Sequence, residues 1–245
     1  YHRSHKGIIR HSIKILQYIP FSCYIAVYML KAIIFDFDGV ITDSEPVHLK
    51  MFQKVLGEMG LSLSEKDYYE IYLGMDDKGC FSTLLKSNGI DSNPEHIQSL
   101  IEKKTTYLMD YIKDNLFIYP GVVEFIGNSS KKYLLAIASG ALRHEIEFVL
   151  ERAGLTSEFN IIVSAEDVAE GKPNPECFNK AVERLNKVSN QRITPAECLV
   201  IEDSIAGIEA AKAAGMRCIA VTNTYGPERL TIADDVVKEL TEINL

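Results

Sequence analysis

Two aspartates spaced by one residue, Asp36 and Asp38, directly follow a short apolar run and are the clearest chemical signal in the sequence. The run from Ile33 to Phe35 is typical of a buried strand. Gly39, behind the aspartates, allows the backbone to turn tightly. Ligands of open parallel sheets bind beyond the carboxyl ends of the strands, so both carboxylates are expected at the mouth of a crevice. Taken alone, the pair also fits two solvated aspartates at the end of a strand.

Polar residues follow three further predicted strands, and each group also has an ordinary structural explanation. Ser139-Gly140 precedes a predicted helix, where a hydroxyl and a helix N-terminus suit an anion, although Ser139 could simply cap the helix. Lys172 lies in a proline-stiffened loop and could be a solvated lysine. Glu202 and Asp203 could be surface acids ahead of a helix. Because all of them follow strands of one predicted sheet, we expect them to lie near Asp36.

Crowded carboxylates at one edge of the sheet predict a cation. Two like charges about 4 Å apart repel by about 4 kcal/mol at an effective dielectric constant of about 20. Four carboxylates, from Asp36, Asp38, Glu202 and Asp203, therefore favour a divalent ion, and hard oxygen ligands suit Mg²⁺. A phosphoryl group would complete the site, with Mg²⁺ and Lys172 neutralising its charge. Asp36 could then attack phosphorus, and Asp38 could serve as general acid and base.

These motifs, in this order, resemble those of the haloacid dehalogenase superfamily of phosphohydrolases. The segment 36–43 reads D-F-D-G-V-I-T-D and is followed along the chain by S-G, K-P and E-D-S. The similarity extends from about residue 29 to residue 221. It is greatest to the branch with a helical cap inserted after the first motif, which includes β-phosphoglucomutase-like enzymes and sugar-phosphate phosphatases.

The resemblance implies a role for each motif residue. Asp36 would be the nucleophile, and Asp38 the acid and base whose backbone carbonyl also binds Mg²⁺. Asp203 would bind the metal, and Glu202 would bind it directly or through water. The phosphate would be held by Ser139, Gly140 and Lys172.

Two further residues are candidate substrate contacts. His48 falls where mutase-like members carry a substrate-side histidine, but it could equally lie on the polar face of the first predicted cap helix. Arg143, after Ser139-Gly140, could touch the substrate or be a solvated helix residue.

From residue 29 the predicted elements alternate between strand and helix, which indicates an α/β fold with a Rossmann-like parallel sheet flanked by helices. The predicted strands are 31–35, 133–138, 159–163, 198–201 and 218–221, with a last helix and strand expected within 227–243. Residues from about 44 to 115 instead read as helices throughout. We therefore expect an inserted all-helical cap domain at 44–116, a core domain at 29–43 and 117–245, and chain crossings near 41–44 and 116–120.

Residues 1–28 contain four basic and no acidic residues and are expected to be an extension outside the fold. Pro20 and Gln17 interrupt their apolar stretch, which argues against a membrane span. We expect a cytoplasmic protein, with organelle targeting by this segment left open.

Composition limits the class of protein. The net charge of −8 argues against nucleic-acid binding, and the five scattered cysteines argue against a disulfide framework or a zinc site. We expect a monomer or weak dimer whose partner is a small phosphorylated metabolite.

The reaction predicted is Mg²⁺-dependent hydrolysis of a phosphomonoester through an aspartyl-phosphate. The alternative is a β-phosphoglucomutase-type phosphomutase. Mutases of the branch tend to carry an arginine in the cap loop after a glycine, but here Gly74 is followed by Asp76, Asp77 and Lys78. Dehalogenation is disfavoured because that reaction needs no metal, whereas Asp38 and the acidic pair Glu202-Asp203 are explained only by a metal site. A phosphorylated but non-catalytic receiver is disfavoured by Asp38 and by the large cap.

Overall fold

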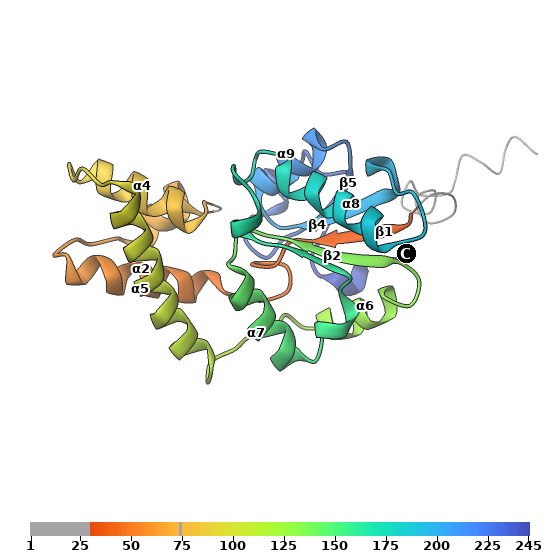
Figure 1. Ribbon diagram of the computed structural model, residues 1–245, viewed down its shortest axis with the longest axis horizontal. Helices are drawn as coiled ribbons and strands as arrows, with labels where there is room; N and C mark the ends of the chain where they lie inside the picture. Colours follow the sequence, from red (N-terminus) through yellow and green to blue (C-terminus); the bar gives the residue numbers. More distant parts are fainter. Residues whose placement is uncertain (1–29, 74) are drawn as a thin grey trace, which may run out of the picture.

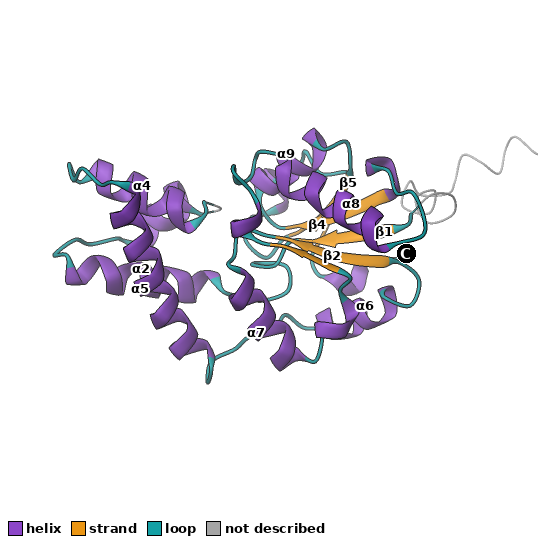
Figure 2. Ribbon diagram, in the orientation of Figure 1, coloured by secondary structure: helices purple, strands orange, loops and turns teal. Residues whose placement is uncertain are grey.

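The computed structural model describes residues 30–73 and 75–245, so the predicted extension at 1–28 lies outside the described residues. At its centre is a sheet of six parallel strands in the order β3-β2-β1-β4-β5-β6 (Figure 2). The strands are β1 (Ala32–Phe35), β2 (Leu134–Ala138), β3 (Ile161–Val163), β4 (Cys198–Glu202), β5 (Arg217–Val221) and β6 (Asp235–Val237). The predicted α/β architecture with a parallel sheet is confirmed.

The register of the three central strands aligns their carboxyl ends. Phe35 of β1 pairs with Ile137 of β2 on one side and with Ile201 of β4 on the other. The next residue of β1, Asp36, donates its backbone N–H to the Ile201 carbonyl at 2.9 Å. The polar residues that follow these strands therefore emerge at one edge of the sheet.

Helices cover both faces of the sheet (Figure 1). Side chains alternate across a strand, so Ala32 and Ile34 pack in the core beneath α8 (Glu176–Val188) and α9 (Ile205–Ala213). Ile33 and Phe35 pack in the opposite core beneath α6 (Val122–Ser129) and α7 (Arg143–Ala153). A strand buried on both faces is apolar along its whole length, which explains the continuous apolar run of β1.

The chain between β1 and β2 forms a helical unit (residues 45–112) with its own apolar core. The unit lies beyond the carboxyl ends of the strands, at the left of Figure 1. Asn93 accepts a hydrogen bond from the His96 backbone N–H at 2.8 Å, so it caps the longest helix of the unit. The unit consists of α2 (Glu45–Glu58), α3 (Glu65–Asp67), the π-helical turn η1 (Tyr68–Tyr72), α4 (Asp77–Ser87) and α5 (Pro94–Ile112).

The two chain segments that join the helical unit to the sheet lie side by side. Thr42 and Ile118 form an antiparallel bridge. The Thr42 hydroxyl donates to the Phe117 carbonyl at 2.6 Å, and the Tyr119 N–H donates to the Ile41 carbonyl at 3.2 Å. A pair of short, hydrogen-bonded crossings leaves the sheet continuous around the insertion.

The last part of the chain differs from the expected helix and strand. β6 is flanked by single 3₁₀ turns, η5 (Pro227–Arg229) and η6 (Leu240–Glu242), and no α-helix forms within 227–243. The apolar side chains that become buried here are Leu230, Leu240 and Ile243, and the gap between the first and the other two is too long for one helical face. Four other 3₁₀ or π turns connect elements: η1, η2 (Thr156–Glu158), η3 (Ala165–Asp167) and η4 (Pro195–Glu197).

The cysteine expectation can be examined in the described part of the chain, whereas the stretch judged unsuited to a membrane span, within residues 1–28, lies outside it. The four cysteines in the described part, which are Cys80, Cys177, Cys198 and Cys218, are buried and form no disulfide. Within residues 30–73 and 75–245, every helix is too short or too polar to cross a membrane.

Phe178 of α8 is fully buried in the core beneath the sheet, whereas Val188 at the end of the same helix is 60% exposed. We predict that Phe178→Ala lowers the free energy of unfolding by about 3–5 kcal/mol, because it leaves a cavity in a packed core. The matched control Val188→Ala should change it by less than about 0.5 kcal/mol. Urea unfolding followed by circular dichroism measures both; equal effects would contradict the described core.

Candidate active site

Lys172 and two carboxylates form a buried ionic cluster at the carboxyl edge of the sheet. The Lys172 Nζ lies 2.8 Å from Asp36 Oδ1 and 2.7 Å from Glu202 Oε1. Asp36 follows β1, Glu202 ends β4, and Lys172 arrives from the loop before α8. The fold therefore brings together three residues that the sequence places 30 to 166 positions apart.

A third carboxylate, from Asp203, completes the cluster. Asp36, Glu202 and Asp203 each offer an oxygen atom, and these atoms lie within 4.8 Å of one another. Burial raises the pKa of Asp203 well above its ordinary value, and the neighbouring Glu202 and Asp36 raise it further. The Thr224 hydroxyl donates to Asp203 Oδ2 and holds the side chain in place.

The cluster fits a divalent cation. Lys172 supplies one positive charge against three carboxylates, and burial raises the pKa of Asp36 to about 7 despite the attraction of Lys172. Three acidic oxygens at this spacing are hard ligands of the type that Mg²⁺ prefers. A cation among them would favour the ionised form of all three.

Glu202 is fixed more firmly than its neighbours. Its Oε2 accepts hydrogen bonds from the backbone N–H groups of Asp203 and Ser204, both at 2.8 Å, and from the Ser204 hydroxyl at 2.9 Å. Burial opposes the charged form, but Lys172 and Ser204 outweigh it and lower the pKa of Glu202. Glu202 therefore stays ionised and anchors Lys172.

Two glycines leave the space that these carboxylates occupy. Gly39 has a φ of +76°, and a Cβ there would lie 1.9 Å from Asp203 Oδ2. A Cβ on Gly207 in α9 would lie 1.6 Å from Glu202 Oε1. The carboxylate cluster can therefore form only because a glycine follows Asp38 in the turn and another glycine lies in the first turn of α9.

The side chain of Asp38 does not join the other three carboxylates, which corrects the expectation of four around one crevice. Asp38 Oδ1 accepts a hydrogen bond from the Ser44 hydroxyl and lies 3.9 Å from His48 Nε2. The reason is that β1 ends at Phe35, so the chain is already turning and Asp38 faces the helical unit. Burial raises the pKa of Asp38 to about 7, and the Ser44 hydrogen bond opposes this rise.

His48 is held beside Asp38 by a lysine that the sequence did not single out. The Lys104 Nζ lies 2.7 Å from His48 Nδ1 and 2.6 Å from Asp77 Oδ1, and Lys104 is fully buried. Burial lowers the pKa of His48 well below its ordinary value, and Lys104 lowers it further. Position 104 falls at helical spacing on the apolar face of α5, between Ile101 and Leu108, and this spacing is the signal that could have found it.

Ser139 and Gly140 lie at the end of β2, and Ser139 is buried. The Ser139 Oγ accepts the Ala141 N–H at 3.0 Å, so it shapes the turn into α7. From the helical unit, Asp76 approaches this turn and also Gly171: its Oδ2 lies 3.4 Å from the position that a Cβ on Gly171 would take. The loop before α4 therefore reaches the edge where Lys172 lies.

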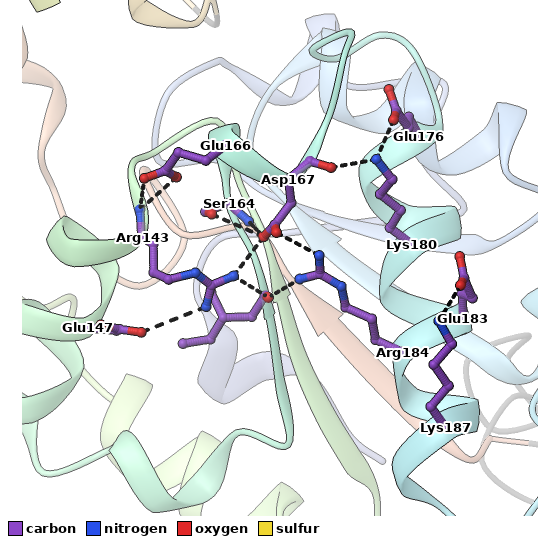
Figure 3. Close-up of polar contacts among 11 residues, drawn as sticks. Arg143, Glu147, Ser164, Glu166, Asp167, Glu176, Lys180, Glu183, Arg184 and Lys187 are labelled. Carbon is purple, nitrogen blue, oxygen red and sulfur yellow. Dashed lines mark hydrogen bonds and ion pairs between the residues drawn. The ribbon is translucent and has the colours of Figure 1, made fainter.

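Arg143 is the first residue of α7, and its side chain has partners within the protein. Its guanidinium donates to Asp167 Oδ2 at 2.7 Å and to the Ile162 carbonyl at 3.0 Å, so these contacts account for the side chain (Figure 3). Arg184 of α8 donates to the same two residues, to Asp167 Oδ1 at 2.6 Å and to the Ile162 carbonyl at 3.0 Å. Arg143 is therefore a helix residue whose side chain, although 37% exposed, ties α7 to the chain that leads to Lys172, and a contact with the substrate stays a prediction.

Asp167 is the centre of this second polar cluster. Its Oδ2 also accepts the Ser164 N–H at 2.9 Å, and its carbonyl accepts from Lys180 (Figure 3). Although partial burial favours protonation, Arg184 and Ser164 hold the pKa of Asp167 well below its usual range. Further along the loop, Glu176 Oε2 accepts the Ala169 N–H at 2.9 Å. Hydrogen bonds of Asp167, before Lys172 in the sequence, and of Glu176, after it, thus hold the loop that carries Lys172.

The fit around Glu202 generates a stability prediction. Gly207→Ala should lower the free energy of unfolding by about 1–3 kcal/mol, because the added methyl overlaps the buried carboxylate. The control is Gly127→Ala in α6, where a Cβ would meet nothing within 4 Å. This substitution should raise the free energy of unfolding by about 0.5–1 kcal/mol. Thermal and urea unfolding of both variants test this. If Gly207→Ala proved as harmless as the control, the described packing around Glu202 would be wrong.

Comparisons with known proteins agree with the fold and the motifs. Residues 33–221 match the family model described as haloacid dehalogenase-like hydrolase. The chain is 31% identical over 194 residues to the phosphorylated carbohydrates phosphatase of Thermotoga maritima, covering 78% of this chain and 84% of that protein. It is 29% identical over 189 residues to the fructose-1-phosphate phosphatase YqaB of Escherichia coli, covering 77% of this chain and 95% of that protein.

Among solved structures, the β-phosphoglucomutase of Clostridium difficile superposes with a TM-score of 0.78 at 26% sequence identity, covering 89% of this chain and 94% of that one. The predicted superfamily is confirmed by the family model, which spans most of the chain, and by relatives that include both phosphatases and a phosphomutase. The chain belongs to the haloacid dehalogenase-like hydrolase family.

Proposed function

We propose that this protein is a Mg²⁺-dependent phosphatase that hydrolyses a small phosphorylated metabolite, a sugar phosphate or a similar phosphomonoester, through an aspartyl-phosphate. The observation that carries the proposal is the buried cluster of Asp36, Glu202 and Asp203, with Lys172 in contact with the first two. Family membership and relatives named as sugar-phosphate phosphatases support the same reaction class.

Asp36 acts as the nucleophile in this proposal. A carboxylate oxygen of Asp36 bonds to phosphorus while the bond between phosphorus and the leaving-group oxygen breaks. Lys172 lies against Asp36, where its charge also attracts the phosphoryl group. Ser139 and Gly140, at the end of the neighbouring strand β2, would hold the phosphoryl oxygens from the other side.

Asp38 acts as the general acid and then the general base. Protonated Asp38 gives its proton to the departing oxygen; the resulting carboxylate then takes a proton from the water that attacks phosphorus and frees Asp36. Its position supports this role, because Ser44 and His48 hold it apart from the other three carboxylates.

The side chains of Asp36, Glu202 and Asp203, together with the backbone carbonyl of Asp38, would hold Mg²⁺. When bound, the ion supplies charge neutralisation for the carboxylates and the phosphoryl group. The protein's own contribution is to exclude water and to fix Lys172 and Glu202 before the substrate arrives.

The helical unit would serve as a cap, with domains at 44–116 for the cap and at 29–43 and 117–245 for the core. Two short crossings allow a hinge, and the loop with Asp76 already reaches Gly171 beside Lys172. Closure of such a cap excludes bulk water from the reaction. His48, carried by α2, would come to the substrate side of Asp38.

The cap loop favours hydrolysis over phosphoryl transfer within a bisphosphate. Asp77, the first residue of α4, pairs with the buried Lys104, so the positive charge of Lys104 is already balanced and is not offered to a second phosphate. Lys78, the next residue of α4, is a point charge and a weaker partner for a phosphate than the bidentate fork of arginine. A cytoplasmic monomer or weak dimer with a small metabolite as its partner remains our prediction.

We predict that Asp36→Asn lowers kcat for p-nitrophenyl phosphate by at least about 10³-fold, because an amide cannot attack phosphorus. Removal of divalent ions with a chelator should abolish turnover, and added Mg²⁺ should restore it. Asp91→Asn, at an exposed position of the helical unit, is the control and should leave turnover unchanged. Full activity of Asp36→Asn, or turnover indifferent to the chelator, would overturn the proposal.

An assay with β-glucose 1-phosphate and a bisphosphate activator distinguishes phosphatase activity from mutase activity. We expect free phosphate and glucose as products, because the cap loop lacks a partner for the second phosphate. Coupled enzyme assays for glucose 6-phosphate and for phosphate measure both outcomes in one reaction. Accumulation of glucose 6-phosphate in place of phosphate would reverse the assignment in favour of a mutase.

A further inference from the structure

Glu145, in the first turn of α7, has a buried carboxylate oxygen with no partner. The side chain is only 5% exposed. Its Oε2 accepts the Leu142 backbone N–H at 3.3 Å and so caps the helix, whereas Oε1 has no hydrogen-bond partner in the described part of the chain. A buried acceptor left unpaired is costly, and a buried charged acceptor more so. An external donor at this position would remove that cost.

The position of Glu145 connects it to the proposed chemistry. It lines a small cavity of about 30 Å³ between α7 and the helical unit, which Asp38, Ser44 and His48 also line. α7 begins at Arg143, three residues after Gly140 of the proposed phosphate loop. The cavity has room for about one water-sized group, so Glu145 would meet the tip of a leaving group that extends from the oxygen that Asp38 protonates.

We propose that Glu145 Oε1 accepts a hydrogen bond from a hydroxyl or amino group on the leaving group, so that the enzyme selects phosphomonoesters of hydroxyl-bearing alcohols. This inference rests on the proposed phosphatase function. Burial raises the pKa of Glu145 to about 7, and above that pH its carboxylate accepts hydrogen bonds and cannot donate them, so it selects for donors. It also repels a second phosphate, so the group that it meets belongs to the uncharged or cationic part of the substrate.

Lys104 is the alternative partner for this oxygen. Two of its three ammonium protons are directed to His48 and Asp77, which leaves one available. A contact with Lys104 would link the helical unit to the core whatever the substrate. The two roles therefore differ in whether the effect of Glu145 depends on the chemistry of the leaving group.

The test compares glycerol 3-phosphate with propyl phosphate, which has the same carbon chain without hydroxyls, in the wild-type protein and in Glu145→Gln with Mg²⁺. Glutamine keeps an acceptor for the Leu142 N–H but loses the charge. We expect the ratio of kcat/KM for glycerol 3-phosphate over propyl phosphate to fall about tenfold to hundredfold in Glu145→Gln. Glu151→Gln, on the exposed side of the same helix, is the control and should leave the ratio unchanged.

Measurements on the wild type alone keep the inference testable if the variant fails to fold, because the wild type should already prefer glycerol 3-phosphate about tenfold or more. No preference in the wild type, an equal loss for both substrates in Glu145→Gln, or an unchanged ratio would each overturn it. Hydrolysis of p-nitrophenyl phosphate by the wild type is assayed in parallel. Its absence would show that the proposed phosphatase function itself is wrong, whereas its presence beside any of the other three results would refute the role of Glu145 alone.

Discussion

The structure depends on keeping three carboxylates close together in a buried place. Asp36, Glu202 and Asp203 repel one another, and burial makes the repulsion stronger. Lys172 offsets part of it through its contacts with Asp36 and Glu202, and backbone N–H groups stabilise Glu202 further. What remains is an excess of negative charge that a divalent ion can balance, and that imbalance is the physical basis for assigning a metal-dependent reaction.

The rest of the fold can be understood as the support of this cluster. The pairing of Phe35 with Ile201 aligns β1 with β4 and brings Asp36 beside Glu202. Gly39 and Gly207 leave room for the carboxylates, and Asp167 holds the chain that leads to Lys172 through Arg143 and Arg184 (Figure 3). The helical unit lies beyond the open edge and contributes His48, which lies beside Asp38 together with Ser44, the residue that precedes α2. Precise placement of reacting groups depends on such supporting contacts as much as on the reacting groups themselves.

The sequence predicted the sheet, its flanking helices and the meeting of the motif residues, because these follow from chain-local patterns and from the geometry of parallel strands. It could not predict which way Asp38 turns, because that depends on where β1 stops and on Ser44 and His48 across the hinge. It missed Lys104, since a lysine on the apolar side of a helix is normally solvated at its tip, and only the packed structure shows Asp77 and His48 around it. The partner of Arg143 escaped the sequence for the same reason: Asp167 is 24 positions away and meets it only through the pairing of β2 with β3. Partners chosen by tertiary contacts leave no periodic signal in a sequence.

The account is tested most directly by locating a bound ion. A crystal of the protein soaked with Mn²⁺, which takes the same hard oxygen ligands as Mg²⁺ and scatters anomalously, would show where a divalent cation resides. The account predicts one strong anomalous peak bounded by Asp36, Glu202 and Asp203, and its loss in Asp203→Ala. A peak elsewhere with none among these three carboxylates, or no bound ion at saturating Mn²⁺, would contradict it.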